Sequence, residues 1–303
     1  MRAHRSQWIS AGVALMALAW MSAHTLAMSA PQSPSVTDDR GQVIHFDKPP
    51  QRIITLLPSL SEMICELDAC DRLVATDRYA NWPVRVRTLP KVGGIDDTPI
   101  EAVIALRPDV VVAASSSRAI HRLEELGIRV VALEPKTFGD IHRAFITLAT
   151  LLGTPDQGAI AWHRLETRMQ AAALRIPASA HGKTVYFEVS DAPHAASTAS
   201  FVGEMLARLG LVSVVPGQLG PFPQLNPEFV VRVQPDLIMA PKESLVSMQA
   251  RPGWSQLMAF QHAMTCGFTT EQFNILVRAG PRLAEAADDI AQCVTTLYAR
   301  NPP

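Results

Sequence analysis

The feature that most constrains the fold of this chain is a segment that occurs twice. "TPIEAVIALRPDVVVAA" runs from Thr98 to Ala114, and "NPEFVVRVQPDLIMA" runs from Asn226 to Ala240. In both copies a glutamate follows a proline, an apolar run leads to a Pro-Asp pair, and a strand-forming run comes next. The glutamates (228 − 101) and the Pro-Asp pairs are separated by the same offset of 127 residues. A constant offset across a helix-turn-strand unit indicates that a whole lobe is duplicated.

The two copies begin with the same helix-start signal. Thr98 and Asn226 are N-cap candidates, and a proline follows each at the first expected helical position. Glu101 and Glu228 then fall in the first turn, where a carboxylate is stabilised by the positive end of the helix dipole. This accounts for both glutamates structurally, and it leaves a second role open.

Short β-rich runs alternate with helical segments on both sides of a helical stretch in the middle of the chain. Val36–Phe46 predicts a hairpin, and Ser59-Leu60-Ser61-Glu62 has the pattern of a capping box opening a helix. The predicted strands are Ile53–Leu57, Leu73–Thr76, Val110–Ala114, Arg129–Leu133, Val185–Val189, Val212–Val215, Leu237–Ala240 and Met264–Cys266. The fold class is therefore α/β, with two similar lobes over residues 36–152 and 183–300 and a bridging helix over 153–177.

Composition excludes several classes of function. Of the 303 residues 48% are hydrophobic and 18% charged, which is typical of a globular protein with a sizeable core. The net charge of −1 provides no electrostatic footprint for nucleic acid. No GxSxG, HExxH, Walker or GxGxxG motif is present, so no catalytic residue and no metal site is assigned.

The first 27 residues have the pattern of a secretory signal peptide. Arg2 and Arg5 precede an apolar run over Ile9–Met21, and Thr25-Leu26-Ala27 is a small-residue cleavage signal. The run is too short for a membrane anchor, which needs about 20 apolar residues. No cysteine lies near the cut, so lipid attachment is unsupported. We expect an exported, periplasmic protein that begins near Met28.

Export to an oxidising compartment permits the four cysteines to pair. Three pairings are possible, and proximity in sequence favours Cys65–Cys70 and Cys266–Cys293. Buried free thiols are the alternative.

Aromatic and polar residues recur in the loops that follow predicted strands in both lobes. Ligands bind at this edge of open α/β sheets. We therefore expect a ligand cleft between the lobes, suited to a bulky, partly planar and partly apolar molecule. The expected ligand-binding residues are Tyr79, Trp82, His194, Phe222 and Phe273.

Five segments together resemble a known family, the helical-backbone substrate-binding proteins of ABC importers, which carry cobalamin, haem or ferric siderophores across the periplasm. The resemblance covers residues 39–298, and within the family the pattern is most similar to the cobalamin-binding proteins. The segments are "QRIITLLPSLSEMICELDACDRLVATDRYANWP", "IEAVIALRPDVVVA", "LEELGIRVVALEP", "GPFPQLNPEFVVRVQPDLIM" and "RAGPRLAEAA".

The resemblance implies two α/β lobes joined by one long rigid helix, with a ligand cleft between them. It also implies that a surface glutamate on each lobe docks on arginines of the two permease subunits, and Glu101 and Glu228 occupy the matching positions. Tyr79 matches a cobalamin-contacting tyrosine, whereas Phe222 and Ile95 stand where the family member has tryptophans and His194 where it has phenylalanine. Its disulfide partner in the second lobe is Leu209 here, so that bridge differs.

The expected function is delivery of a corrinoid to an ABC permease dimer in the inner membrane, by a monomer that needs no cofactor and catalyses no reaction. A haem or ferric-siderophore receptor of the same fold is the alternative, in which His194 or Tyr79 would ligate a metal centre. A periplasmic metal-cofactor enzyme is the weaker alternative from another class.

Overall fold

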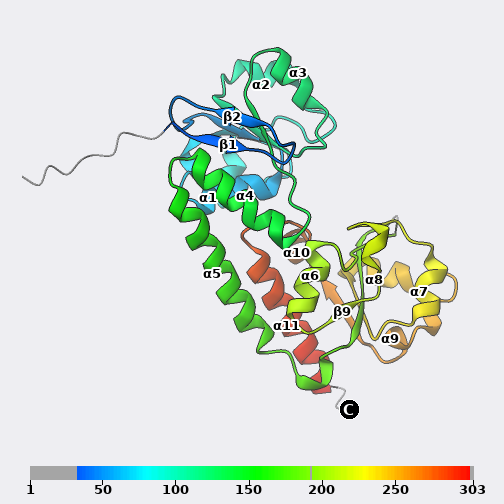
Figure 1. The fold of residues 1–303 in the computed structure, drawn as a ribbon. Helices are drawn as coiled ribbons and strands as arrows, with labels where there is room; N and C mark the ends of the chain where they lie inside the picture. Colours follow the sequence, from blue (N-terminus) through cyan, green and yellow to red (C-terminus); the bar gives the residue numbers. More distant parts are fainter. Residues whose placement is uncertain (1–32, 192, 301–303) are drawn as a thin grey trace, which may run out of the picture. The chain divides into compact units, whose positions relative to one another are not determined.

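The computed structural model describes residues 33–191 and 193–300. The expected signal peptide lies outside these residues. Figure 1 shows the order of the helices and strands along the chain.

The first lobe contains a parallel sheet with the strand order β4-β3-β5-β6, and every residue of β3, β5 and β6 is buried. Burial on both faces is what continuous apolar runs predict for a parallel sheet. An antiparallel hairpin of β1 and β2 precedes the sheet, as expected. The strands are β1 (Ser35–Thr37), β2 (Val43–His45), β3 (Ile53–Thr55), β4 (Leu73–Thr76), β5 (Val110–Ala113) and β6 (Val130–Ala132).

The second lobe repeats this arrangement with the strand order β9-β7-β10-β11, in which all neighbours are parallel. When only the parallel strands of each sheet are counted in chain order, the first lies between the second and the third, and the fourth is at the edge. The duplication inferred from the sequence is thus a duplication of sheet topology. A short strand, β8, is added antiparallel to the end of β7. The strands are β7 (Thr184–Ser190), β8 (His194–Ala195), β9 (Val212–Ser213), β10 (Leu237–Pro241) and β11 (Thr265–Phe268).

Helices connect the strands within each lobe, and α4, α5 and α11 lie where the two lobes join. Figure 1 shows α5 beside α11, and the two helices are in contact. The α-helices are α1 (Pro58–Glu66), α2 (Ile100–Ala105), α3 (Ala119–Glu125), α4 (Phe138–Leu151), α5 (Pro155–Ala173), α6 (Phe201–Arg208), α7 (Pro227–Val233), α8 (Lys242–Gln249), α9 (Met258–Gln261), α10 (Thr270–Leu276) and α11 (Leu283–Arg300). Short 3-10 helices lie at Cys70–Arg72, Val84–Thr88, Ala178–Ala180, Gly217–Leu219 and Trp254–Gln256.

One hydrophobic cluster runs through both lobes. It includes Met63 of α1, Leu165 of α5, Phe201 of α6 and Ile290 of α11, all buried. Each sheet also has a separate cluster that stays within its own lobe. Because bending the lobes apart would expose part of the shared cluster to water, burial of apolar surface opposes such bending.

Two local predictions about helix starts are wrong in detail. Helix α1 begins at Pro58 with Leu57 as N-cap and no side-chain cap, so Ser59 and Glu62 do not form a capping box. Both side chains are buried inside the helix instead. Asn226 does cap α7, since its side chain accepts a hydrogen bond from the amide of Glu228, but Thr98 donates its hydroxyl to the carbonyl of Gly94 rather than capping α2.

Both expected disulfides are present. Cys65–Cys70 joins the end of α1 to the turn after it, and Cys266–Cys293 joins β11 to α11. No cysteine among the described residues is free. The second bridge closes the larger loop and holds the edge strand of the second sheet against α11.

Within residues 33–191 and 193–300, none of the helices combines the length and the apolar composition that a membrane span requires.

Candidate functional site

A cavity of about 590 Å³ opens between the two lobes, at the loops that follow the sheet strands. The first lobe contributes the loop after β4 and the segment after β6, and the second lobe contributes Phe201, Phe222 and the end of α10. This is the edge where ligands bind in open α/β sheets. The lining residues are Leu57, Pro58, Ser59, Arg78, Tyr79, Asn81, Glu134, Pro135, Lys136, Phe201, Phe222, Asn274, Val277, Arg278 and Ala279.

Tyr79 lies on the first-lobe wall of this cavity. Its side chain is 64% exposed, and its amide donates to the buried carboxylate of Asp77 at 2.8 Å. Tyr79 also lines a second cavity of about 410 Å³, which adjoins the first and reaches Gly94 and Ile95. The guanidinium of Arg78 lies over the ring, 5.9 Å from its centroid, and the exposed part of the ring offers flat apolar surface.

Phe222 lies on the opposite wall. It is half-buried and packs edge-on against Phe201, with ring centroids 5.7 Å apart. Phe201 opens helix α6, whose N-cap Ser200 accepts a hydrogen bond from the amide of Gly203. The helix start therefore fixes one aromatic ring, and that ring supports the other.

The other three expected ligand residues lie outside the lining of this cavity. Trp82 faces Arg282, whose guanidinium is 4.3 Å from the ring centroid. Phe273 is stacked on Phe187 with centroids 6.0 Å apart, and it packs against the core. The Nδ1 atom of His194 is 3.1 Å from the hydroxyl of Ser190. The structure thus brings Tyr79 and Phe222 to the cavity and leaves Trp82, Phe273 and His194 beside it.

Every cationic side chain of the lining is paired with a carboxylate. Arg78 pairs with Asp97 on the first lobe, Lys136 lies 3.4 Å from Glu134, and Arg278 lies 2.9 Å from Glu62. Two asparagines, Asn81 and Asn274, add neutral polar groups. The charges around the cavity therefore balance.

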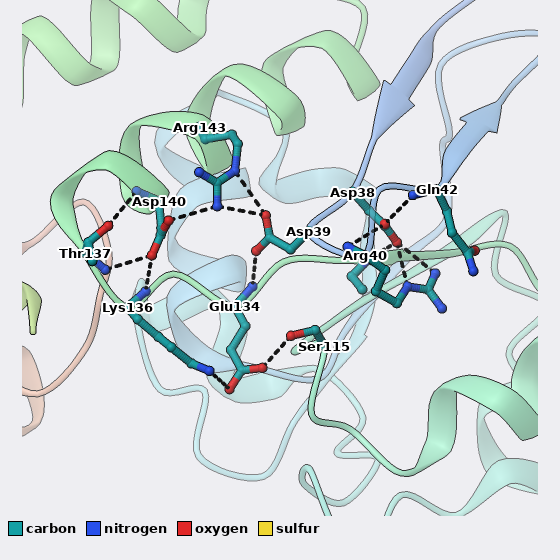
Figure 2. A network of polar contacts seen from close by, with 11 residues as sticks. Asp38, Asp39, Arg40, Gln42, Ser115, Glu134, Lys136, Thr137, Asp140 and Arg143 are labelled. Atoms are coloured by element: carbon teal, nitrogen blue, oxygen red, sulfur yellow. Dashed lines mark hydrogen bonds and ion pairs between the residues drawn. The ribbon is translucent and has the colours of Figure 1, made fainter. Parts of the chain in front are cut away.

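Glu134 is part of a polar network that ties the β1–β2 hairpin to the cavity (Figure 2). Its carboxylate accepts hydrogen bonds from the hydroxyl of Ser115 and the amide of Ser116. Burial favours the protonated form, but these hydrogen bonds and the ammonium of Lys136 outweigh it and hold the pKa of Glu134 below its usual value. The carboxylate is therefore ionised at neutral pH.

The same network positions the backbone of the cavity floor. Asp39 of the hairpin accepts a hydrogen bond from the amide of Glu134 at 2.7 Å and pairs with Arg143 of α4. Asp140 caps the start of α4 by accepting hydrogen bonds from the amides of Lys136 and Thr137. The hairpin and the first turn of α4 thus hold the Glu134–Thr137 segment from two sides.

Hydrogen bonds donated by two backbone amides join this floor to the second lobe. The carbonyl of Lys136 accepts from the amide of Phe201 at 2.7 Å, and Glu204 of α6 accepts from the amide of Phe138 at 2.7 Å. The guanidinium of Arg208 lies 4.4 Å from the ring centroid of Phe138. The lobes are therefore bonded directly at the floor of the cavity, in addition to sharing a core.

Sequence reasoning missed most of the polar lining. Arg78 and Asn81 flank Tyr79 in the "RYANWP" segment, so their proximity to that tyrosine could have indicated them. Arg278 belongs to the "RAGPRL" segment, whose resemblance to the family carries no role for this arginine. Glu134 and Lys136 follow β6 directly, and the position after a parallel strand was the available signal.

Asp77 is the one buried side chain of the described residues with an oxygen that has no hydrogen-bond partner. Its Oδ1 accepts from the amide of Tyr79, while Oδ2 has none. Burial raises the pKa of Asp77 to about 6, although this amide and the charges of Lys91 and Arg278 oppose the shift. The backbone amide of this cavity-lining tyrosine is therefore bonded to a carboxyl group whose pKa is about 6.

Among the described residues, no group of three or more histidines, cysteines, aspartates or glutamates is placed to hold a metal ion. The two glutamates of the repeat lie away from the cavity, exposed in the first turns of α2 and α7. Within the described part of the chain, no ion pair includes Glu101 or Glu228.

Two topologically equivalent lobes, a connection through helices and a cavity at the loop edges define a two-lobed ligand-binding protein. A family model described as periplasmic binding protein matches residues 53–263, which cover most of both lobes. The chain belongs to the periplasmic binding protein family.

Relatives by sequence carry two kinds of name. The chain is 26% identical to an uncharacterized ABC transporter substrate-binding lipoprotein of Bacillus subtilis, over 86% of this chain and 85% of the relative. It is also 26% identical to a vitamin B12-binding protein of Pectobacterium carotovorum, over 82% of this chain and 90% of the relative. Both names describe binding proteins, and the first assigns its protein to an ABC transporter.

Solved structures share the fold. The periplasmic vitamin B12-binding protein of Vibrio cholerae matches with a TM-score of 0.68 and 24% identity, over 84% of this chain and 99% of that one. A periplasmic haem-binding protein from Pseudomonas aeruginosa matches with a TM-score of 0.70 and 21% identity, over 82% of this chain and 93% of that one. At these identities the likeness shows the fold alone. A vitamin B12-binding protein and a haem-binding protein share this fold, so the fold does not distinguish the two ligands.

Proposed function

We propose that this protein is the substrate-binding protein of an ABC importer, that it works in the periplasm, and that its ligand is a corrinoid such as cobalamin. The cavity between the lobes would hold the ligand, with Tyr79 and Phe222 in contact with it from opposite walls. Relatives named as vitamin B12-binding proteins support the choice of ligand.

The observation that carries this proposal is the balanced charge of the cavity. Arg78, Lys136 and Arg278 each already have a carboxylate partner. The periphery of cobalamin consists mainly of neutral carboxamides, which asparagine side chains can meet as donors and acceptors. Haem brings two carboxylates, and many ferric siderophores bring net negative charge. Binding either one would require cations that are now used within the protein.

The lining residues also suit a ligand that brings its own metal ligands. The lining contains no histidine, cysteine or methionine. Cobalamin holds its cobalt in a macrocycle and carries a lower ligand of its own, so it needs no axial ligand from the protein. A neutral, partly apolar cavity is sufficient for it.

A haem receptor is the second candidate, and one observation favours it. Tyr79 is a cavity residue with an exposed side chain, and a phenolate oxygen can ligate ferric iron. His194 supports this alternative less, because it lies outside the cavity lining and faces Ser190.

Glu101 and Glu228 are proposed as the docking residues for the two subunits of the permease. Each lies in the first turn of the helix before the third strand of its lobe, so the two positions are equivalent in the duplicated fold. Both are exposed and outside the cavity lining. An exposed ion pair contributes about 0–1 kcal/mol, so two of them would orient the complex more than they tighten it.

Calorimetric titration of the mature protein with cyanocobalamin, haemin and a ferric siderophore tests the ligand. We expect a dissociation constant below about 1 μM for cyanocobalamin, corresponding to about −8 kcal/mol. Tyr79→Ala and Phe222→Ala should each weaken binding, whereas His194→Ala should leave it within about twofold. Tight binding of haemin without cyanocobalamin would overturn the corrinoid assignment, and chemical turnover of any of the three would overturn the receptor.

A further inference from the structure

Two arginines of the second lobe contact a single loop of the first lobe. Arg278 and Arg282 lie in the turn between α10 and α11, and the loop is Arg78–Trp82, which carries Tyr79. Nη1 of Arg278 donates to Oδ1 of Asn81 at 2.7 Å, and Nη2 donates to the carbonyl of Tyr79 at 3.1 Å. The loop that presents the tyrosine is therefore bonded across the lobe boundary.

Arg278 is itself held rigidly. Its Nη1 also donates to Oε1 of Glu62 at 2.9 Å, and only 12% of the arginine side chain and 2% of the glutamate side chain are exposed. Glu62 is buried in α1 of the first lobe, where burial raises its pKa and the bond to Arg278 opposes the shift. A desolvated, hydrogen-bonded ion pair has one well-defined geometry.

Arg282 holds the other end of the loop. Its guanidinium lies over the ring of Trp82, 4.3 Å from the centroid, and Glu285 of α11 orients it through two hydrogen bonds of 2.9 and 3.0 Å. Arg282 does not line the ligand cavity but, with Trp82, lines a smaller cavity of about 280 Å³ that adjoins it at Asn81, Asn274 and Arg278. Its contacts with Trp82 and Glu285 are the means by which it holds the loop.

The exposure of Tyr79 makes these contacts important for its position. The residue is 64% exposed, and its ring contacts the guanidinium of Arg78 in the same loop, 5.9 Å from the centroid, so the backbone of the loop decides where the ring points. On the first lobe, the amide of Tyr79 bonds to Asp77 at 2.8 Å. Its carbonyl bonds to Arg278 of the second lobe. The amide and the carbonyl of Tyr79 are thus held by different lobes.

We propose that Arg278 and Arg282 are positioning residues for Tyr79: the second lobe sets the place of a ligand contact that belongs to the first. The expected effect on ligand affinity rests on the proposed function, because it requires Tyr79 to contact the ligand. The expected effect on the position of the loop is independent of which ligand binds.

Hydrogen exchange of the ligand-free protein tests the loop. Arg278 cannot simply be removed, since Glu62 would be left buried and unpaired, so the variant is Glu62→Gln with Arg278→Met. We expect amides of residues 79–82 to exchange about tenfold faster in this variant, and faster also in Arg282→Met. Unchanged exchange in both variants would overturn the proposal.

The second lobe supplies a matched control. Arg251 pairs with Glu188 at 2.6 Å, the two side chains are 18% and 1% exposed, and the guanidinium lies 4.7 Å from the ring centroid of Trp254. Glu188→Gln with Arg251→Met removes an equally buried pair that lies outside the cavity lining. Exchange of residues 79–82 should stay within about twofold of the parent protein, and an equal acceleration there would mean general loosening and overturn the positioning role.

Titration with cyanocobalamin separates positioning from direct contact. Arg282→Met should weaken binding about three- to tenfold, and the loss should vanish when Tyr79 is already alanine. The same cycle for Glu62→Gln with Arg278→Met should give no further loss in the Tyr79→Ala background. A full additional loss would make Arg278 a direct contact and overturn its positioning role. Absence of cobalamin binding to the parent protein would reject the proposed ligand, while the exchange result would still decide on the loop.

Discussion

Asp109 and Asp236 accept hydrogen bonds at equivalent positions in the two lobes. One carboxylate oxygen of Asp109 accepts the amides of Gln51 and Arg52, at 2.7 and 2.9 Å. One oxygen of Asp236 accepts the amide and the hydroxyl of Thr184, at 2.8 and 2.7 Å. Each aspartate thus binds the chain where the first parallel strand of its sheet begins, β3 or β7. The repeated Pro-Asp pair is a latch between the third strand of a lobe and the first.

Replacing either aspartate should weaken its own lobe. We expect Asp109→Asn and Asp236→Asn each to lower the free energy of unfolding by about 1–2 kcal/mol, because a charged acceptor of two hydrogen bonds is lost. The two effects should add, since the sites lie in different lobes. Urea unfolding measures both, with Asp71→Asn, an exposed aspartate of the first lobe, as the control. No loss in either variant would contradict the latch.

For Asp236 the latch has a defined pH dependence. Burial would raise the pKa, but the hydrogen bonds from Thr184 and the charge of Lys183 outweigh it, so the pKa lies below the usual value. The stabilisation is therefore fully present above the unfolded-state pKa of about 4 and is lost as pH falls through the lower, folded-state value.

The repeat explains why so much of the fold could be predicted from the sequence. A fixed offset between two helix-turn-strand units specifies the same strand order twice, and buried parallel strands have a clear apolar signature. The capping-box prediction failed because Glu62 of the pattern Ser59-x-x-Glu62 takes part in a tertiary ion pair instead. Glu62 pairs with Arg278, which is 216 residues away, and no local rule reports such a partner.

The candidate site was less predictable for the same reason. Tyr79 and Phe222 follow strands and do line the cavity, as the strand-end rule suggests. Trp82 follows the same strand as Tyr79, yet its ring is covered by the guanidinium of Arg282 from the other lobe. Which aromatic side chain lines this cavity depends on tertiary contacts between the lobes.

Asp77 should give the protein an unusual component of its pH dependence. Its folded-state pKa of about 6 lies above the ordinary value of 3.8, so the folded protein binds the proton more tightly. The resulting stabilisation is fully present below about pH 4 and is lost as pH rises through 6. Asp77→Asn should therefore flatten the pH dependence of unfolding between pH 4 and 8 by about 1–3 kcal/mol.

Urea unfolding at several pH values measures this, with Asp71→Asn as the control for loss of an aspartate. The comparison is between slopes, because replacing Asp77 also changes its interaction with Lys91 and shifts the whole curve. A variant curve parallel to that of the parent protein would contradict the assignment of the titration to Asp77.

Gly203 should tolerate no side chain. A Cβ atom on this residue would lie 2.8 Å from the carbonyl carbon of Ser197 and closer still to its oxygen, both of them backbone atoms. Gly203→Ala should lower the free energy of unfolding by about 2–4 kcal/mol and disturb Phe201, two residues earlier at the cavity. Gly139→Ala in α4 is the control, since its Cβ would come no closer than 3.6 Å to Oγ1 of Thr137.

That control should be neutral or gain up to about 1 kcal/mol, because alanine favours the helix more than glycine does. Thermal unfolding compares the two variants directly. Equal stability of both would show that the close approach of α6 to Ser197 relaxes without cost.

Docking is expected to depend on charge at two equivalent points. Reversing both Glu101 and Glu228 to arginine should place like charges against the arginines proposed on the permease, which costs several kcal/mol at an interface. Ligand uptake through the importer should fall at least about tenfold, while ligand affinity should stay within about twofold.

The control reverses Asp156 and Glu243, which are also exposed first-turn carboxylates, on α5 and α8. It matches the change in net charge and the loss of helix-dipole stabilisation, so it should leave uptake near that of the parent protein. An equal fall in both double variants would attribute the effect to net charge rather than to docking. Loss of ligand binding in the Glu101 and Glu228 variant, with the fold intact, would contradict a docking role altogether.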